Sequence, residues 1–154
     1  MAIEKRIGEM KVSRKECEDD KTVGYLDKLN NERLDNTRRR VAHAIRILKP
    51  LVQSTYKSAE QKDVVRTGAA HAVNLLEVAA EEMRYHCEWF DYDDSVVYHI
   101  DDACDMLGQA MAETFEDGYD AESAAEDVKD ACVFLAKALA TLVQWEGDCD
   151  VNEI

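Results

Sequence analysis

The sequence predicts an all-α protein, a bundle of four main amphipathic helices preceded by a charged N-terminal arm. Three observations predict this class. The 154 residues include only one proline and six glycines, which favours a few long helices over many short strands. Apolar residues recur at steps of three and four, the period of a helix with one buried face. An apolar content of 46% is sufficient to fill a single core.

The predicted organisation has three parts. They are a charged arm at 1–20, a helical bundle at 21–147 and a short acidic tail at 148–154. The four main helices of the bundle are predicted at about 22–49, 59–90, 95–116 and 121–146. Short connections between the later helices predict that they lie antiparallel to one another.

The stretch 59–90 is the longest of these helices, and the others are expected to pack against it. Ser58 and Gln61 form a capping-box pattern at its start. Its small and apolar residues follow the three-four spacing of one buried stripe. They are Val65, Gly68, Ala69, Ala72, Leu76, Ala79, Met83, Cys87 and Phe90.

The other three helices carry the same spacing and have recognisable ends. The first has Leu34, Thr37, Val41, Ala44 and Leu48 on one face. Pro50 then bars its regular continuation, because the proline ring clashes with the preceding turn. Asp120 or a residue near it starts the fourth helix, and Gly118 and Gly147 are predicted to end the third and fourth helices.

Charge is divided unevenly along the chain. Residues 1–66 hold 16 Lys/Arg and 11 Asp/Glu, whereas residues 67–154 hold 3 Lys/Arg and 22 Asp/Glu. The simplest explanation is that the basic first helix lies against acidic later helices, in the same chain or in a second copy. A net charge of −14 repels nucleic acid and anionic membranes, so we expect direct binding to neither.

The five cysteines are odd in number and include no Cys-x-x-Cys pair. Cys87, Cys104 and Cys132 fall on predicted apolar faces, where a free thiol behaves as a small hydrophobe. This favours a reducing compartment, and we expect a cytoplasmic protein. The N-terminus has no apolar segment of the kind found in signal peptides, and no run approaches the length of a membrane span.

Acidic residues on the later helices are the main candidates for a functional surface. Many recur one helical turn apart, where like charges are neighbours and repel one another. A rigid array of carboxylates can occupy a Lys/Arg-rich groove by imitating phosphates, whereas the alternative is a solvated face that only keeps the protein soluble. The candidate partner-binding residues are Glu77, Glu81, Glu82, Trp89, Asp93, Asp94, Asp101, Asp102, Asp105, Glu122 and Glu126.

Trp89, Phe90 and Tyr92 lie among these acids. Two interpretations of the aromatic residues stay open. They can form a hydrophobic plug at the end of the bundle, or they can form a binding epitope, because aromatic side chains often anchor interfaces.

Two resemblances to enzyme families give alternative functions. Glu77 and Glu81 on one predicted helix, with Asp102 and Asp105 on the next, resemble the motif of all-α nucleotide pyrophosphatases. That resemblance implies Mg²⁺ held by these four carboxylates against a nucleoside triphosphate. The spacing Arg-x4-His occurs at Arg38–His43 and Arg66–His71 and resembles the active motif of HEPN-type ribonucleases, where it implies that Arg and His act on the scissile phosphate.

The function that the sequence favours is a non-enzymatic interaction protein without a metal or another cofactor. It is expected to bind a basic protein surface, such as that of a nucleic-acid-binding protein, as an inhibitor or a nucleic-acid mimic. Small, strongly acidic proteins of this kind suit a phage or mobile element. An exposed apolar stripe on the 59–90 helix would invite a second copy, so a homodimer is left open.

Overall fold

In a computed structural model the protein is a four-helix bundle, as the sequence predicts, and no strand occurs in the described residues. The structure describes residues 20–52, 59–115 and 120–152. Its elements are α2 (Asp20–Leu48), the short 3₁₀-helix η1 (Lys49–Val52), α3 (Ala59–Phe90), α4 (Ser95–Glu113) and α5 (Ala121–Asn152). Among the helices in these ranges, none has both the length and the apolar character that crossing a membrane requires.

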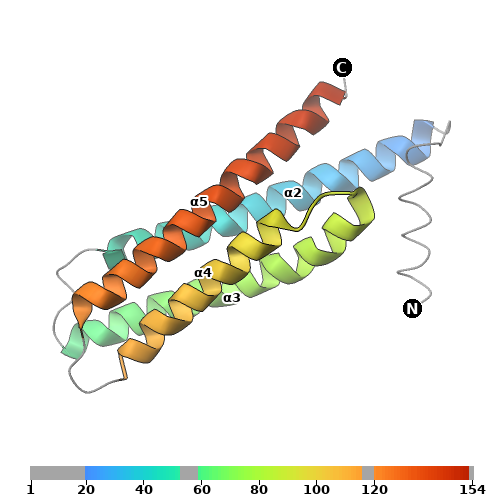
Figure 1. The fold of residues 1–154 in the computed structure, drawn as a ribbon. Coiled ribbons are helices and arrows are strands. Elements are labelled where there is room, and N and C mark those ends of the chain that lie inside the picture. The colour runs from blue at the N-terminus through green and yellow to red at the C-terminus, as the bar shows by residue number, and fades with distance from the viewer. Residues whose placement is uncertain (1–19, 53–58, 116–119, 153–154) are drawn as a thin grey trace.

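The four helices form a ring in which each packs against two neighbours. α2 contacts α3 and α5, and α4 contacts α3 and α5. Consecutive helices run antiparallel, so the start of α2 and the end of α5 lie at the same end of the bundle as the α3–α4 turn (Figure 1). Antiparallel helices joined by short connections are typical of an up-down bundle.

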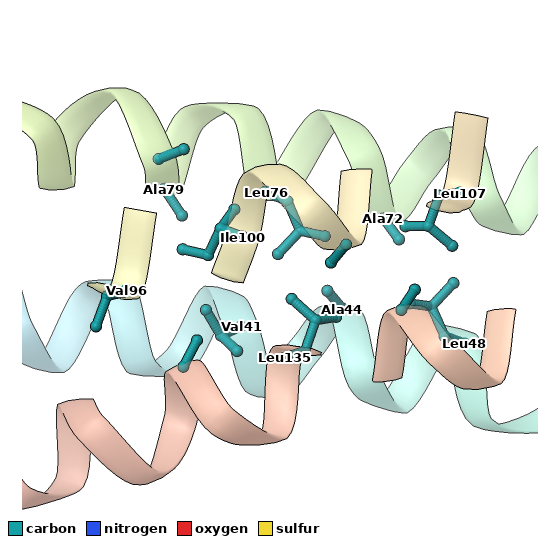
Figure 2. Close-up of a cluster of buried hydrophobic side chains, with 14 of the residues drawn as sticks. Val41, Ala44, Leu48, Ala72, Leu76, Ala79, Val96, Ile100, Leu107 and Leu135 are labelled. Atoms are coloured by element: carbon teal, nitrogen blue, oxygen red, sulfur yellow. The ribbon is translucent and has the colours of Figure 1, made fainter. Parts of the chain in front are cut away.

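The core consists of the predicted stripes. Every member of the α2 stripe is buried, and the centre of the α3 stripe is fully buried from Ala69 to Met83. Figure 2 shows Leu76, Ile100 and Leu135 from three different helices pointing into one apolar cluster. Many stripe positions are alanine, and such small side chains allow the helix backbones to approach closely.

Two predicted helix ends are wrong. α4 ends at Glu113, three residues early, and Thr114 and Phe115 form a turn there. α5 continues to Asn152 instead of stopping at Gly147, so the predicted tail at 148–154 begins as helix. An interior glycine costs only about 1 kcal/mol relative to alanine, and no proline follows to forbid the next turn.

Other end predictions are confirmed. α2 ends at Leu48, two residues before Pro50, and the chain continues as η1. Asp120 caps α5, because its Oδ1 accepts hydrogen bonds from the backbone N–H groups of Glu122 and Ser123 at 3.0 and 3.2 Å. The N-terminal arm, the Ser58 capping position and Gly118 lie outside the described residues.

The basic first helix lies against acidic partners in the same chain at two points. Arg38 of α2 donates to Glu146 of α5, with Nε 3.0 Å from Oε2. Arg40 of α2 pairs with Glu82 of α3. The predicted packing of basic on acidic helices therefore occurs within one chain, although partly exposed ion pairs such as these contribute only about 1 kcal/mol each.

Candidate functional site

The predicted acidic residues lie on the surface of α3, α4, α5 and the α3–α4 turn. Asp101 is half-buried, as is Trp89, and the other nine candidates are exposed. Each acid on α3 and α4 alternates with core residues of the same helix, so Glu77 directly follows the fully buried Leu76. The packed core therefore fixes the positions from which these carboxylates project.

Three of the candidates have partners within the chain. Glu82 pairs with Arg40, and Asp101 accepts two hydrogen bonds of 2.9 Å from Arg84. Asp93 accepts hydrogen bonds from the hydroxyl and the backbone N–H of Ser95. These bonds, with a smaller contribution from the charge of His99, lower the pKa of Asp93.

The remaining predicted acids on the helices have no ion pair among the described residues. They are Glu77, Glu81, Asp102, Asp105, Glu122 and Glu126. Within the described ranges, no group of three or more His, Cys, Asp or Glu side chains gathers closely enough to hold a metal ion. The four carboxylates of the pyrophosphatase-like motif are thus not brought together there.

In each Arg-x4-His segment the arginine and the histidine make contacts in different places. His43 and His71 are both exposed and contact each other edge-to-face, with ring centroids 5.8 Å apart. Arg38 instead reaches Glu146, because five residues along a helix rotate a side chain by about 140°. The structure therefore brings the two histidines together and takes the arginines to other helices.

Arg66 caps the C-terminus of α4. Its Nη2 donates to the backbone carbonyl of Thr114 at 3.1 Å, and its Nε donates to the Thr114 hydroxyl at 3.0 Å. The guanidinium also lies 3.7 Å from the centroid of the exposed Phe115 ring. A cation at a helix C-terminus interacts favourably with the free carbonyls, which gives Arg66 a structural contribution.

The aromatic residues near the α3–α4 turn form a cluster with a buried polar pair. We call Asn30, His86, Phe90, Tyr92 and Trp145 the aromatic end. His86 stacks on Phe90 and Tyr92 with centroid distances of 4.5 and 5.8 Å, and Tyr92 stacks on Trp145 at 4.3 Å. Trp89 lies apart from this stack, under the guanidinium of Arg33 at 4.8 Å.

Hydrogen bonds connect the polar members of the aromatic end. Asn30 Nδ2 donates to the Tyr92 hydroxyl at 2.9 Å, so its Oδ1 faces His86 Nε2 at 2.6 Å. An amide oxygen can only accept, so Nε2 carries the proton and Nδ1 does not. His86 Nδ1 is buried and has no hydrogen-bond partner among the described residues.

The backbone of the turn places Tyr92 in this cluster. Asp91 has a positive φ of 60°, and the Tyr92 N–H donates to the Cys87 carbonyl at 3.2 Å. This is the Schellman arrangement, with Asp91 taking the left-handed position usually held by glycine. It folds the chain back over the last turn of α3, which brings the Tyr92 ring onto His86.

Burial changes the pKa of His86 and of the thiols. Desolvation, with a smaller contribution from the charge of Arg33, lowers the pKa of His86 to about 3. Desolvation is also the main cause that raises the pKa of Cys87 and Cys104 to about 12, and it raises that of Cys132. All three thiols are free, and at neutral pH they are protonated and unreactive.

The contact between Asn30 and His86 was not predicted from the sequence. A signal for it exists in the spacing. Asn30 lies four residues before Leu34, and His86 lies three residues after Met83, so both continue a buried stripe. A polar residue that continues a buried stripe needs a buried partner, which the three-four pattern alone does not identify.

Comparison of the chain with protein-family models, with curated proteins and with solved structures finds no match.

Proposed function

We propose that this protein binds a basic partner protein through the outward carboxylates of α3, α4 and α5. The observation that supports the proposal most is a set of six predicted acids on these helices that are exposed and have no ion pair among the described residues. The set consists of Glu77, Glu81, Asp102, Asp105, Glu122 and Glu126. Residues 67–154 contain only 3 Lys/Arg against 22 Asp/Glu, so few cations of the chain are available to neutralise this surface.

The spacing of the acids is a second support. Glu77 and Glu81 are one turn apart on α3, and Glu122 and Glu126 repeat that spacing on α5. Like charges at this spacing destabilise a helix by a few tenths of a kcal/mol per pair. Lys or Arg side chains of a partner would remove that repulsion. Its removal would make the free energy of binding more favourable.

A nucleic-acid-binding partner fits this surface best. Grooves that bind phosphates are lined with Lys and Arg, and their affinity is largely electrostatic. Carboxylates fixed on packed helices offer negative charge at set positions, and the protein would act as an inhibitor or nucleic-acid mimic by occupying the groove. A cytoplasmic location agrees with the free thiols of Cys87, Cys104 and Cys132.

The test is affinity capture of partners from a cell lysate, followed by titration of the captured protein at low and high salt. The variant Glu81→Gln/Asp105→Asn removes two unpaired carboxylates. Exposed ion pairs contribute up to about 1 kcal/mol each, so we expect binding to weaken by about tenfold. Its dependence on salt should also become less steep, and duplex DNA should compete with the wild-type protein for the partner.

The matched control is Glu32→Gln/Asp63→Asn, which changes the net charge equally. Glu32 is exposed on α2, and Asp63 is exposed and makes only an exposed pair with Arg66. Binding by this variant should stay within about twofold of the wild type. Equal weakening by both variants, or binding that does not change with salt, would contradict a localised acidic interface.

A further inference from the structure

The aromatic end joins three helices through one buried imidazole. Asn30 comes from α2, His86 from α3 and Trp145 from α5, and Tyr92 lies in the turn before α4. His86 is 0% exposed, and its Nε2 is hydrogen-bonded to Asn30. Its ring stacks on Phe90 and on Tyr92. The packing of this end of the bundle therefore depends on the state of His86.

Neutral His86 fits this environment and protonated His86 does not. The Nε2–H already has its acceptor in Asn30, and protonation would add an N–H at Nδ1, where no acceptor lies among the described residues. An unpaired buried N–H has a free-energy cost, and a buried charge has a larger one. Opening the cluster would let water reach the ring and remove both costs.

The surrounding charges do not compensate a buried imidazolium. On α2, Arg33 acts on His86 and opposes its protonation. On α3, Glu82 pairs with Arg40, and on α5, Glu146 pairs with Arg38. The charges of the turn acids Asp93 and Asp94 make smaller contributions to the raised pKa of Cys87. None of these four acids is among the causes that shift the pKa of His86.

We propose that the aromatic end is a pH-sensitive clasp, closed while His86 is neutral and opened when His86 takes up a proton. Opening separates the start of α2 and the end of α5 from the α3–α4 turn and exposes Tyr92 and Trp145. The proposal is independent of the acidic interface, because it depends on buried groups and on no partner.

Opening at this end is favoured over unfolding of the whole bundle. Leu76, Ile100 and Leu135 of the hydrophobic core are fully buried, whereas Tyr92 and Trp145 of the aromatic end are only partly buried and pack against that core. The clasp lies at the end of the bundle where α2 begins and α5 ends (Figure 1). Local opening at helix ends requires less free energy than global unfolding, since it leaves the central contacts intact.

Amide hydrogen exchange between pH 7 and pH 5 tests the clasp. An exposed histidine has a pKa near 6.5, so the open form binds about a quarter of a proton more than the closed form at pH 7 and nearly one proton more at pH 5. The ratio of open to closed forms should therefore rise roughly 25-fold between pH 7 and pH 5. Amide protection, corrected for intrinsic exchange, should fall by that factor in residues 26–34, 83–92 and 139–146. Protection around Leu107 and Leu135 should change far less.

Tryptophan fluorescence gives a second measurement. The only two tryptophans are Trp89 and Trp145, and both lie near this end, so their emission should change with the loss of protection. Far-ultraviolet circular dichroism should show that most helix remains at pH 5. Loss of all helix in step with the fluorescence change would overturn local opening.

Two variants make the assignment specific to His86. His86→Phe/Asn30→Leu keeps an apolar ring in the stack and removes both polar partners, so protection should change less than about twofold between pH 7 and pH 5. His99→Gln removes a partly exposed histidine and should keep the full wild-type change.

The protonation of His86 can also be followed by NMR in the wild-type protein, so the test does not depend on the folding of the double variant. The NMR signals of the closed form should show no titration of the His86 ring between pH 7 and pH 5. A His86 ring that titrates near pH 6.5 in the fully protected protein would overturn the clasp. The same conclusion would follow if protection in residues 83–92 were equal at both pH values.

Discussion

The centre of the buried interior and its aromatic end differ in chemistry. The centre of the bundle is built from aliphatic side chains of all four helices, such as Leu76, Ile100 and Leu135, which have no polar atoms to satisfy. The aromatic end buries Asn30 and His86, each of which needs a partner at a fixed position. Aliphatic packing supplies most of the stability, and the polar pair makes the arrangement at one end specific.

The largest effect is expected in the aliphatic centre. Leu76→Ala should lower the free energy of unfolding by about 2–5 kcal/mol, because it removes a fully buried side chain and leaves a cavity. Urea unfolding followed by circular dichroism measures this. The control is Val78→Ala on the same helix, where the side chain is 46% exposed and the change should be below about 0.5 kcal/mol. Similar losses in the two variants would show that the centre is not the source of stability.

A smaller effect is expected at the aromatic end. Tyr92→Phe keeps the stacked ring and removes the hydroxyl that accepts from Asn30 Nδ2, so a partly buried hydrogen bond is lost. The free energy of unfolding should fall by about 0.5–1.5 kcal/mol. Tyr98→Phe is the control, because Tyr98 is 63% exposed on α4 and should tolerate the change. An unchanged stability of Tyr92→Phe would mean that the Asn30 amide finds another acceptor.

The smallest effect separates close packing from helix propensity. A Cβ at Gly108 of α4 would meet nothing within 4 Å, so Gly108→Ala should stabilise the protein by about 0.5–1 kcal/mol. A Cβ at Gly68 of α3 would lie 2.7 Å from Cδ1 of Leu51, so Gly68→Ala should gain less or lose stability. Thermal unfolding of both variants measures the difference, and equal gains would contradict a close contact between η1 and α3.

The sequence was sufficient to predict the aliphatic centre and most of the helices. Ala59, Phe90 and Ser95 were predicted correctly as helix ends, because the Ser58–Gln61 capping pattern marks the start of α3 and the acids after Phe90 interrupt the three-four pattern. The end of α5 was predicted wrongly, because the helix tolerates Gly147 at modest cost and nothing after it forbids helical geometry.

The aromatic end was harder to predict for a physical reason. The contact between Asn30 and His86 joins residues 56 positions apart, and local spacing carries no information about which polar residues meet across helices. The left-handed conformation of Asp91 is similarly hidden, since glycine is the residue that normally marks such a turn. The predicted acidic residues lie at the surface, with Asp101 half-buried, and their function stays a prediction because it depends on a partner that the chain does not contain.

The short α3–α4 turn has a consequence for the order in which the molecule assembles. The pair of helices that it joins needs only local contacts, since the Tyr92 N–H reaches the Cys87 carbonyl five residues away. The aromatic end instead joins Tyr92 to Asn30, which are 62 residues apart in the chain. The contact of α2 with α5 through Arg38 and Glu146 joins residues that are 108 positions apart. Loop closure makes such distant contacts slow to form, so the α3–α4 pair is the natural starting unit of folding and the aromatic end closes late.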